Sequence, residues 1–533
     1  MYTLSSLSPR KKAFLFSTLL LTASGFICRV LGFFYRIFLS RTIGAEGLGI
    51  YHMVHPVFGI CFSLCAGSIQ TALSQLIASR TADGKRIFHR GIVLSMGMSL
   101  ILSALICRYS DFLARYVLMA PECAPYLPVM GISVPFAAFH ACINGYYYGV
   151  QKSRVPAFSQ IAEQVIRMTL VFFLASSMIA AGKEITVELA VTGHLIGEIA
   201  SALFTFLCLI FIPPQRTSPS APAQTPAASI SLPLLTLAFP LMGNRLVLNI
   251  LASAEAVWIP NCLQRFGLSS VEAFSVYGVL TGMALPFILF PSAITNSMAV
   301  LLLPNVAQAQ SEGKQERISS CIAMSLRYSL YMGILCTGIF ILFGSALGNS
   351  VFHDPTAGRF IRILAWLCPF LYLSTTTGSI LNGLGRTRTT FLHNTAALIL
   401  RICFVLFGIP RFGILAYLWG MLASELFLSL LHLYALFRQI PFFWNAWEMI
   451  GKPSFFLLLS AGIHYFVSAL HPETRAASPL SGNCPANILF LFFLWRTAAG
   501  IPPGTVERQT VAPAAPGQNP ALPTPSVSWE VHY

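Results

Sequence analysis

The stretch that decides the fold is residues 13–51, AFLFSTLLLTASGFICRVLGFFYRIFLSRTIGAEGLGIY. It contains an apolar run long enough to cross a bilayer, which takes about 20 residues, yet Arg29 and Arg36 lie inside it. An arginine near the bilayer centre costs on the order of 3 kcal/mol, so it is expected to face a protein interior or a watery cavity. Seven residues make about two helical turns, so both guanidinium groups are predicted on one face of the helix. The stretch therefore predicts a membrane helix with a cationic face.

The composition extends this prediction to the whole chain. Its 533 residues are 56% hydrophobic and only 10% charged, and the mean hydropathy is +0.71, which is typical of an all-α polytopic membrane protein. We predict 13–14 transmembrane helices, thirteen long and one short, from the uncharged runs at 14–38, 52–76, 91–107, 127–149, 158–180, 188–212, 233–259, 273–303, 321–344, 358–381, 390–409, 412–437, 453–471 and 486–496.

Loop charge predicts the orientation. With the N-terminus inside, sixteen loop Lys and Arg residues lie on the cytoplasmic side and eight on the opposite side. We therefore expect a multi-pass protein of a bacterial cytoplasmic membrane with a cytoplasmic N-terminus. The net charge of +15 is then attributed to topology and to anionic membrane lipids, and no basic stripe with interleaved aromatics indicates nucleic acid.

An internal repeat divides the chain. Residues 149–167 align without a gap with residues 383–401, so that Gly149, Lys152, Arg154 and Arg167 fall on equivalent residues 234 positions later. Because both copies join the end of one helix to the start of the next, they predict two six-helix lobes in a parallel pseudo-twofold repeat. The expected organisation is an N-terminal lobe over 1–212, a Pro/Ala/Ser linker over 213–233, a second lobe over 234–437, extra helices over 438–496 and a disordered Pro/Ala-rich tail over 497–533.

Motifs of catalysis and metal binding are absent from the sequence. There is no G-x-x-x-x-G-K-[ST] loop, no H-E-x-x-H, no G-x-S-x-G and no C-x-x-C pair among the 13 cysteines. We therefore expect no enzyme, no catalytic residue, no metal and no cofactor.

The candidate functional residues are the ionisable ones inside the predicted helices. Arg29, Arg36, Arg245 and Glu255 are the candidates for a substrate-binding cavity, with pairing between Arg245 and a carboxylate as the structural alternative. A second set could be structural or could serve in coupling: Glu163 and Arg167, which are spaced for an i, i+4 ion pair, and Glu198, Arg401 and Glu425. His140, His194 and His393 are expected to be hydrogen-bonded core residues more often than proton carriers.

The charge of the cavity indicates the substrate class. Guanidinium binds phosphate through two parallel hydrogen bonds and stays charged, so several arginines with few acids favour an anionic head group such as a pyrophosphate. A cation exporter would be expected to offer carboxylates instead.

At these residues the chain resembles a known family. The segments CRVLGFFYRIFLSRTIGAEGLGIY, NGYYYGVQKSRVPAFSQIAEQVIR, FPLMGNRLVLNILASAEAVWIP and YGVLTGMALPFILFPSAITNSMAVLLLPNVAQAQ are similar to the stage V sporulation protein B branch of polysaccharide biosynthesis proteins. That branch belongs to the MOP superfamily (multidrug, oligosaccharidyl-lipid and polysaccharide exporters), and the resemblance covers about residues 10–470. It implies a V-shaped, MATE-like arrangement of two six-helix lobes.

The resemblance also bears on the site. Related lipid II flippases keep arginines in the first helix, and Arg29 and Arg36 match that pattern. They carry another arginine in the eighth helix, where this chain has residues 277–281, YGVLT, so Arg245 is expected to substitute for it. The C-terminus departs from the family, and a native tail and a frameshift both stay open as explanations.

Together these observations predict a flippase. It would move an undecaprenyl-diphosphate-linked oligosaccharide or a peptidoglycan precursor to the outer leaflet, and the resemblance alone suggests spore cortex synthesis. The alternatives are a flippase for another lipid-linked polysaccharide, a cation-coupled multidrug exporter and, in a different class, a non-transporting scaffold that binds cell-wall synthesis proteins.

Overall fold

The chain folds as a membrane protein made of helices. The computed structural model describes residues 9–79, 84–213, 228–296, 306, 309–310, 312–440 and 445–470, and these ranges contain no strand. The predicted short helix at 486–496 and the tail at 497–533 lie outside the described residues. The helices are α1 (Pro9–Phe62), α2 (Ser68–Ser79), α3 (Gly84–Arg108), α4 (Ser110–Phe112), α5 (Leu127–Gly149), α6 (Arg154–Ala180), α7 (Val187–Phe211), α8 (Ala228–Phe266), α9 (Ser270–Gly278), α10 (Leu285–Leu289), α12 (Gln315–Leu347), α13 (Pro355–Leu364), α14 (Cys368–Gly383), α15 (Thr387–Cys403), α16 (Ile409–Phe412), α17 (Ile414–Gln439) and α18 (Lys452–Leu470).

Eleven helical segments of the described chain are long and apolar enough to span a membrane. One of them, Leu20–Ser79, is 60 residues long and contains non-helical backbone at Gly44, where φ is 71°, so it supplies two of the predicted helices. A further predicted helix, at 453–471, corresponds to α18. Within the described residues, the thirteen long helices predicted from sequence all correspond to helical segments; the ends of two of them, at 297–303 and 471, lie outside those residues.

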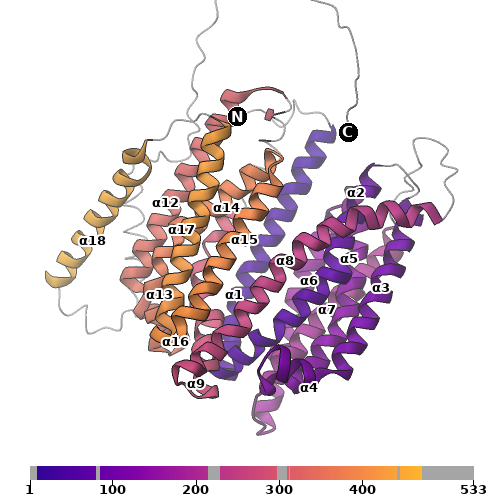
Figure 1. Cartoon of the computed structure of the whole chain (residues 1–533), viewed down its shortest axis with the longest axis horizontal. Helices are drawn as coiled ribbons and strands as arrows, with labels where there is room; N and C mark the ends of the chain where they lie inside the picture. Colours follow the sequence, from indigo (N-terminus) through magenta and orange to yellow (C-terminus); the bar gives the residue numbers. More distant parts are fainter. Residues whose placement is uncertain are drawn as a thin grey trace, which may run out of the picture.

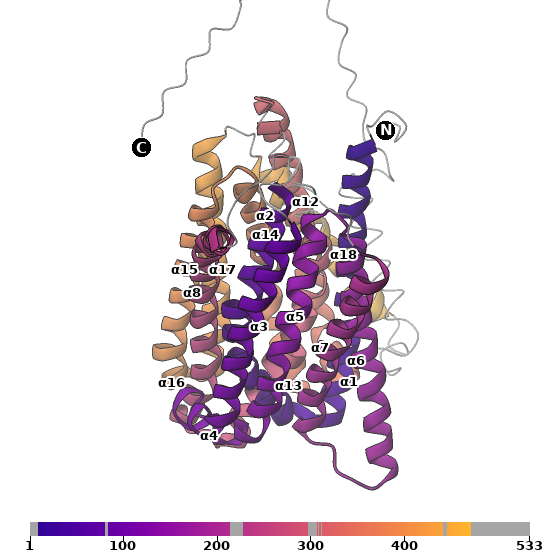
Figure 2. The same cartoon turned by 90° about the vertical axis from the view of Figure 1, so that its right-hand side faces the viewer.

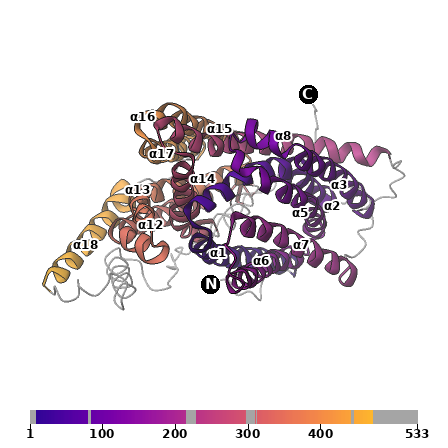
Figure 3. The same ribbon diagram turned by 90° about the horizontal axis from the view of Figure 1, so that it is seen from below.

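The helices form two lobes that lie side by side. Helices α2, α3, α5, α6 and α7 make up one lobe, α12, α13, α14, α15 and α17 the other, and α1 runs between them (Figures 1 and 3). The long helices run roughly parallel to one another (Figure 2). Helix α8 crosses from one lobe to the other, because it packs against α2 and α3 as well as against α15 and α16.

The repeat seen in the sequence is also a repeat of backbone structure. After α5, the amides of Val150, Gln151 and Lys152 donate to the carbonyls of residues 146, 148 and 147. After α14, the amides of residues 384, 385 and 386 donate to the carbonyls of 380, 382 and 381, which are the same bonds 234 positions later. Gln151 and Gly385 share a left-handed backbone, with φ of 59° and 75°. The two lobes therefore use one helix-ending turn at equivalent places.

The linker differs in one respect from its expected extent. Helix α8 begins at Ala228, so residues 228–233, which the composition assigned to an extended linker, belong to a helix. Pro233 lies inside this helix, as do Pro240 and Pro260. In a membrane such prolines are tolerated, because neighbouring helices provide partners for the freed backbone groups.

Candidate functional site

The candidate site is a groove of about 480 Å³ between α1 and residues 286–296, which belong to α10 and to the segment that follows it. Its lining residues are Cys28, Arg29, Gly32, Phe33, Arg36, Pro286, Leu289, Phe290, Ser292 and Asn296. The first five come from the N-terminal half of α1 and the last five from residues 286–296, so the groove lies where α1 faces the second lobe.

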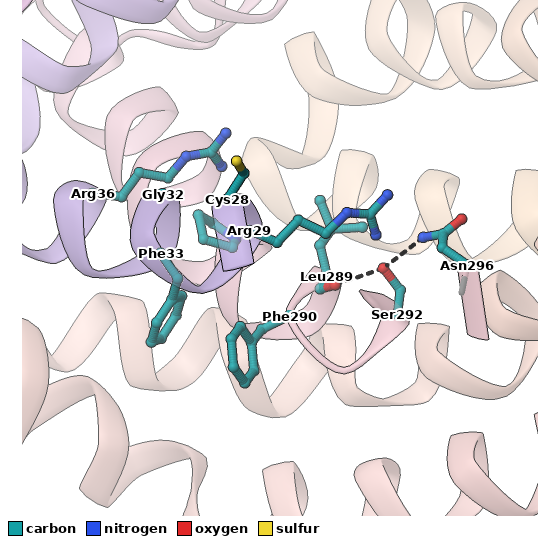
Figure 4. A pocket seen from close by; sticks show the side chains of 10 residues that line it. Cys28, Arg29, Gly32, Phe33, Arg36, Leu289, Phe290, Ser292 and Asn296 are labelled. Atoms are coloured by element: carbon teal, nitrogen blue, oxygen red, sulfur yellow. Dashed lines mark hydrogen bonds between the residues drawn. The ribbon is translucent and has the colours of Figure 1, made fainter. Parts of the chain in front are cut away.

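Arg29 and Arg36 both line this groove, as their seven-residue spacing predicts. Their guanidinium groups extend on the side away from the rings of Phe33 and Phe290 (Figure 4). Both arginines are exposed to the groove. Within the described part of the chain, neither has a carboxylate within 4 Å. The groove therefore presents two positive charges that the neighbouring side chains leave uncompensated.

An aromatic wall lies beneath these charges. The ring of Phe33 lies 4.9 Å from that of Phe287 and 4.8 Å from that of Phe290, measured between centroids. Beside these rings, in the same segment as Phe290, Ser292 Oγ donates to the carbonyl of Leu289, and Asn296 Nδ2 donates to Ser292 Oγ (Figure 4). Such a surface can bind an anionic head group through the guanidinium groups and apolar or sugar surface through the rings.

Glu255, which was predicted to lie in the substrate cavity, does not line this groove. Its side chain is buried, and the Arg401 guanidinium donates to it through Nη2 (2.6 Å) and also contacts it through Nε. Tyr417 OH donates to its other oxygen at 2.6 Å. Glu255 is therefore the acceptor of an ion pair that joins α8, α15 and α17, and α8 supplies no free carboxylate here.

Arg245 also lies outside the groove of Arg29 and Arg36. Its Nη2 donates to Thr71 Oγ1 at 3.0 Å, and its guanidinium packs against Gly67, where an added Cβ would lie 2.4 Å from Nη1. Arg245 is thus exposed and contacts the first lobe at α2. Its partner is a hydroxyl, not the carboxylate that the structural alternative predicted. Its contact with a substrate stays a prediction.

The acidic and basic residues of α6 and α7 form a separate cluster inside the N-terminal lobe. Arg167 Nη2 donates to Glu163 Oε1 at 2.6 Å, which confirms the predicted i, i+4 ion pair. Glu198 accepts from His140 at 2.9 Å. Sequence reasoning placed these residues individually but gave no signal that helices α5, α6 and α7 bring them together.

Glu425 lies in the second lobe beside two small polar cavities. It accepts from Ser374 Oγ at 3.1 Å, and together with Asn394 and Leu428 it lines both cavities, of about 300 and 290 Å³. His432 and His393 stack at the edge of this region with their ring centroids 5.3 Å apart. Within the described residues, no three His, Cys, Asp or Glu side chains gather as metal ligands would.

Sequence analysis missed the residues that join the lobes at the end opposite the start of α1. Arg41 donates to the carbonyls of Val351 (2.9 Å) and Ser350 (3.2 Å), and Ser270 Oγ donates to Glu122 Oε1 at 2.8 Å. Helices α1 and α9 touch through glycine, since a Cβ added to Gly278 would lie 1.9 Å from the carbonyl oxygen of Ala45. The lobes are therefore in contact at this end, whereas the groove lies nearer the start of α1.

Comparison with known protein sequences finds relatives of this chain. A family model described as "Polysaccharide biosynthesis protein" matches residues 14–266. Stage V sporulation protein B of Bacillus subtilis (strain 168) is 26% identical over 448 residues, which is 81% of this chain and 85% of that protein. Lipid II flippase MurJ of the same organism is 20% identical over 403 residues, which is 70% of this chain and 73% of that protein.

Solved structures show the same architecture. A lipid II flippase MurJ in an inward closed conformation superposes with a TM-score of 0.70 at 15% identity, covering 91% of this chain and 98% of that one. An inward-facing multidrug resistance MATE family transporter of the MOP superfamily superposes with a TM-score of 0.62 at 15% identity, covering 79% of this chain and 98% of that one. The chain has the fold of the MOP superfamily transporters. The resemblance to polysaccharide biosynthesis proteins, stage V sporulation protein B among them, is confirmed, and the groove of this MOP-fold chain lies between its two lobes.

Proposed function

We propose that this chain is a flippase for a lipid-linked anionic saccharide, an undecaprenyl-diphosphate-linked sugar or peptidoglycan precursor, which it moves from the inner to the outer leaflet. The observation that carries the proposal is the pair of uncompensated guanidinium groups, Arg29 and Arg36, in the groove between the lobes. Two arginines at this spacing can hold a diphosphate by bidentate hydrogen bonds.

The names of the relatives support the same substrate class. The matched family model carries the description "Polysaccharide biosynthesis protein", and one of the relatives is named lipid II flippase MurJ. A cationic substrate is disfavoured, because the carboxylates of Glu163 and Glu255 are paired with arginines and the groove itself is positive. A role in spore cortex synthesis rests on the likeness to stage V sporulation protein B.

A flippase also needs a groove that opens alternately to the two sides. With a cytoplasmic N-terminus, the lobes touch on the outer side, at Arg41 and Gly278, and the groove faces inward. The charged head group would enter the groove from the inner leaflet while the polyprenyl chain stays in lipid.

The test is binding and flipping of a fluorescent undecaprenyl-diphosphate disaccharide by the full chain in vesicles. Arg29→Ala and Arg36→Ala should each lower affinity and flipping at least tenfold, since a hydrogen bond to a charged group contributes about 1.5–3 kcal/mol. Lysine at either position should restore function only in part, because it offers charge without the planar fork.

Arg108→Ala is the matched control. Arg108 ends α3, and its guanidinium lies over the ring of Tyr109 at 5.7 Å, away from the groove. This variant should bind and flip like the wild type. Normal transport by both Arg29→Ala and Arg36→Ala would refute the proposal.

A further inference from the structure

The N-terminal lobe contains a buried ionic cluster that is distinct from the arginine groove. His140 of α5 and Glu198 of α7 are joined by a 2.9 Å contact between Nε2 and Oε2, with side chains only 14% and 9% exposed. His194 lies one turn before Glu198, and its Nε2 is 3.8 Å from the other carboxylate oxygen. One buried carboxylate is thus flanked by two imidazoles.

A second carboxylate and one arginine complete the cluster. Glu163 of α6 accepts from Arg167, and these side chains are 19% and 14% exposed. Arg167 packs on the backbone of α7, since a Cβ added to Gly197 would lie 3.1 Å from its Nε. This contact places the guanidinium beside Glu198, the next residue, and the electrostatic interactions of Arg167 extend to both carboxylates.

The charges of this cluster do not balance when every imidazole is neutral. Glu163 and Glu198 contribute two negative charges and Arg167 one positive charge, which leaves −1 in a region with little water. An unpaired buried charge is costly, and a group in that position tends to take up a proton instead. One proton on an imidazole would make the cluster neutral.

The hydrogen bonds identify the imidazole concerned. His140 Nε2 has a carboxylate partner at 2.9 Å, which a charged imidazole requires, and Nδ1 lies 3.5 Å from Asn144 Nδ2. With the Asn144 amide turned over, its Oδ1, which has no partner among the described residues, accepts from a protonated Nδ1.

Helix α1 also faces the cluster, with Cys28, Arg36, His52, His55 and the phenols of Tyr35 and Tyr51. The electrostatic interactions of Arg36 are with Tyr51, His52 and His55, whereas Arg167 is the arginine that acts on both carboxylates. Among the described residues, His52 Nε2, His55 Nδ1 and Tyr35 OH have no hydrogen-bond partner. The His55 ring contacts those of Tyr51, His194 and His52, with centroids 4.6, 5.3 and 6.0 Å apart.

We propose that His140 and Glu198 form a proton-binding site, occupied by one proton when the groove is in the conformation seen here. The proton resides on the His140 imidazole and is held by the Glu198 carboxylate. Because Arg167 compensates only one of the two carboxylates, Glu163 and Glu198, the added proton makes the cluster neutral. The site has no counterpart in the second lobe, where the positions 234 residues later are Ser374 and His432.

The site is connected to the arginine groove through Gln164. Its side chain accepts from Arg167 Nη2 at 3.1 Å, and its Nε2 lies 3.7 Å from the Cβ position of Gly32, a groove residue. A proton on the cluster makes this wall of the groove less negative, so a proton and an anionic head group favour each other's binding. This linkage rests on the proposed function, whereas the proton site itself does not.

The proton site is tested by nitrogen NMR of histidine-labelled full chain in nanodiscs at neutral pH. The signal of His140, assigned among the 11 histidines through its loss in His140→Gln, should be that of a doubly protonated imidazolium. It should become that of a neutral ring in Glu198→Gln and also in Glu163→Gln, because either change removes the excess negative charge. Glu425→Gln, which changes a half-buried carboxylate of the other lobe, should leave the signal unchanged.

The Glu163→Gln variant distinguishes two causes of protonation, the net charge of the cluster and the hydrogen bond to Glu198 alone. This substitution removes one negative charge but leaves the bond between His140 and Glu198 in place. A neutral His140 in the wild type would overturn the proposal. So would an imidazolium that persists in Glu163→Gln.

The linkage is tested by binding of undecaprenyl diphosphate to the same nanodiscs at two pH values. Wild-type affinity should fall with rising pH more steeply than that of Glu198→Gln, by at most about tenfold per pH unit for one proton. The variant corrects for titration of the lipid phosphate itself. If the wild type binds no diphosphate lipid, the proposed function fails while the NMR result still decides the proton site; equal slopes with binding intact would overturn the linkage.

Discussion

At the scale of single residues, the charges inside the membrane fall into two groups with different surroundings. Arg29 and Arg36 are exposed to the groove and have no carboxylate partner among the described residues. Arg401 is instead held by Glu255, which is 5% exposed. Free guanidinium groups are suited to an incoming anion, whereas a satisfied pair holds helices together.

The pair of Arg401 and Glu255 gives a prediction about stability. Arg401→Met should destabilise the protein by about 3–5 kcal/mol, because it leaves the Glu255 carboxylate buried without a cation. Glu255→Gln combined with Arg401→Met should recover most of that loss, since neither remaining group is charged. Thermal unfolding of the full chain in detergent, followed by circular dichroism, measures both. A double variant as unstable as Arg401→Met alone would show that packing, not charge, sets the cost.

Residue spacing shows what could be predicted at this scale. The seven-residue interval of Arg29 and Arg36 and the four-residue interval of Glu163 and Arg167 are local, so helix geometry was enough to place them. The partner of Glu255 lies 146 residues away along the chain, and no spacing rule reaches that far. The position of Arg245 against Thr71 was missed for the same reason, since it depends on how α8 crosses the first lobe.

At the scale of helices, the two lobes are joined where backbone meets backbone. Gly49 and Gly278 let α1 and α9 approach so closely that an added Cβ would lie 2.1 Å and 1.9 Å, respectively, from a carbonyl oxygen of the other helix. The contact must separate if the lobes are to open at this end. Small residues at a helix crossing allow such close packing in a membrane.

We therefore predict that Gly278→Ala shifts the protein away from the conformation described here. The methyl group would meet the Ala45 carbonyl, which is backbone and cannot move aside without displacing α1. Spin labels at Arg115→Cys and Arg265→Cys, two exposed positions on opposite lobes, should report longer distances in this variant than in the parent. Gly97→Ala on α3 is the control, because nothing lies within 4 Å of its Cβ position. Unchanged distances in Gly278→Ala would mean that this crossing does not hold the lobes together.

At the scale of the whole molecule, the two lobes repeat the same backbone but not the same buried charges. The turns after α5 and α14 share three hydrogen bonds and a left-handed residue, so the repeated backbone was visible in the sequence as matching Gly, Lys and Arg positions. The charged interior was not repeated with it. Arg167 pairs within its own helix, while its equivalent, Arg401, pairs with a residue of α8. Each lobe thus keeps the scaffold and differs in its buried polar groups.

The orientation of the whole molecule in the membrane follows from its loop charges and is open to a direct test. Thr387→Cys and Lys85→Cys are exposed positions at the starts of α15 and α3, at the end of the molecule where α1 begins, and Lys183→Cys lies in the exposed turn between α6 and α7 at the opposite end. In intact cells a membrane-impermeant maleimide should label Lys183→Cys, and it should label the other two only after permeabilisation, because basic turns are retained on the cytoplasmic side. Among the described residues, the exposed native thiols are Cys107 and Cys403, and they must be replaced by serine first so that they add no background. Labelling of Thr387→Cys from outside would invert the topology, and the groove of Arg29 and Arg36 would then face the outer leaflet, where a flippase substrate is released rather than collected.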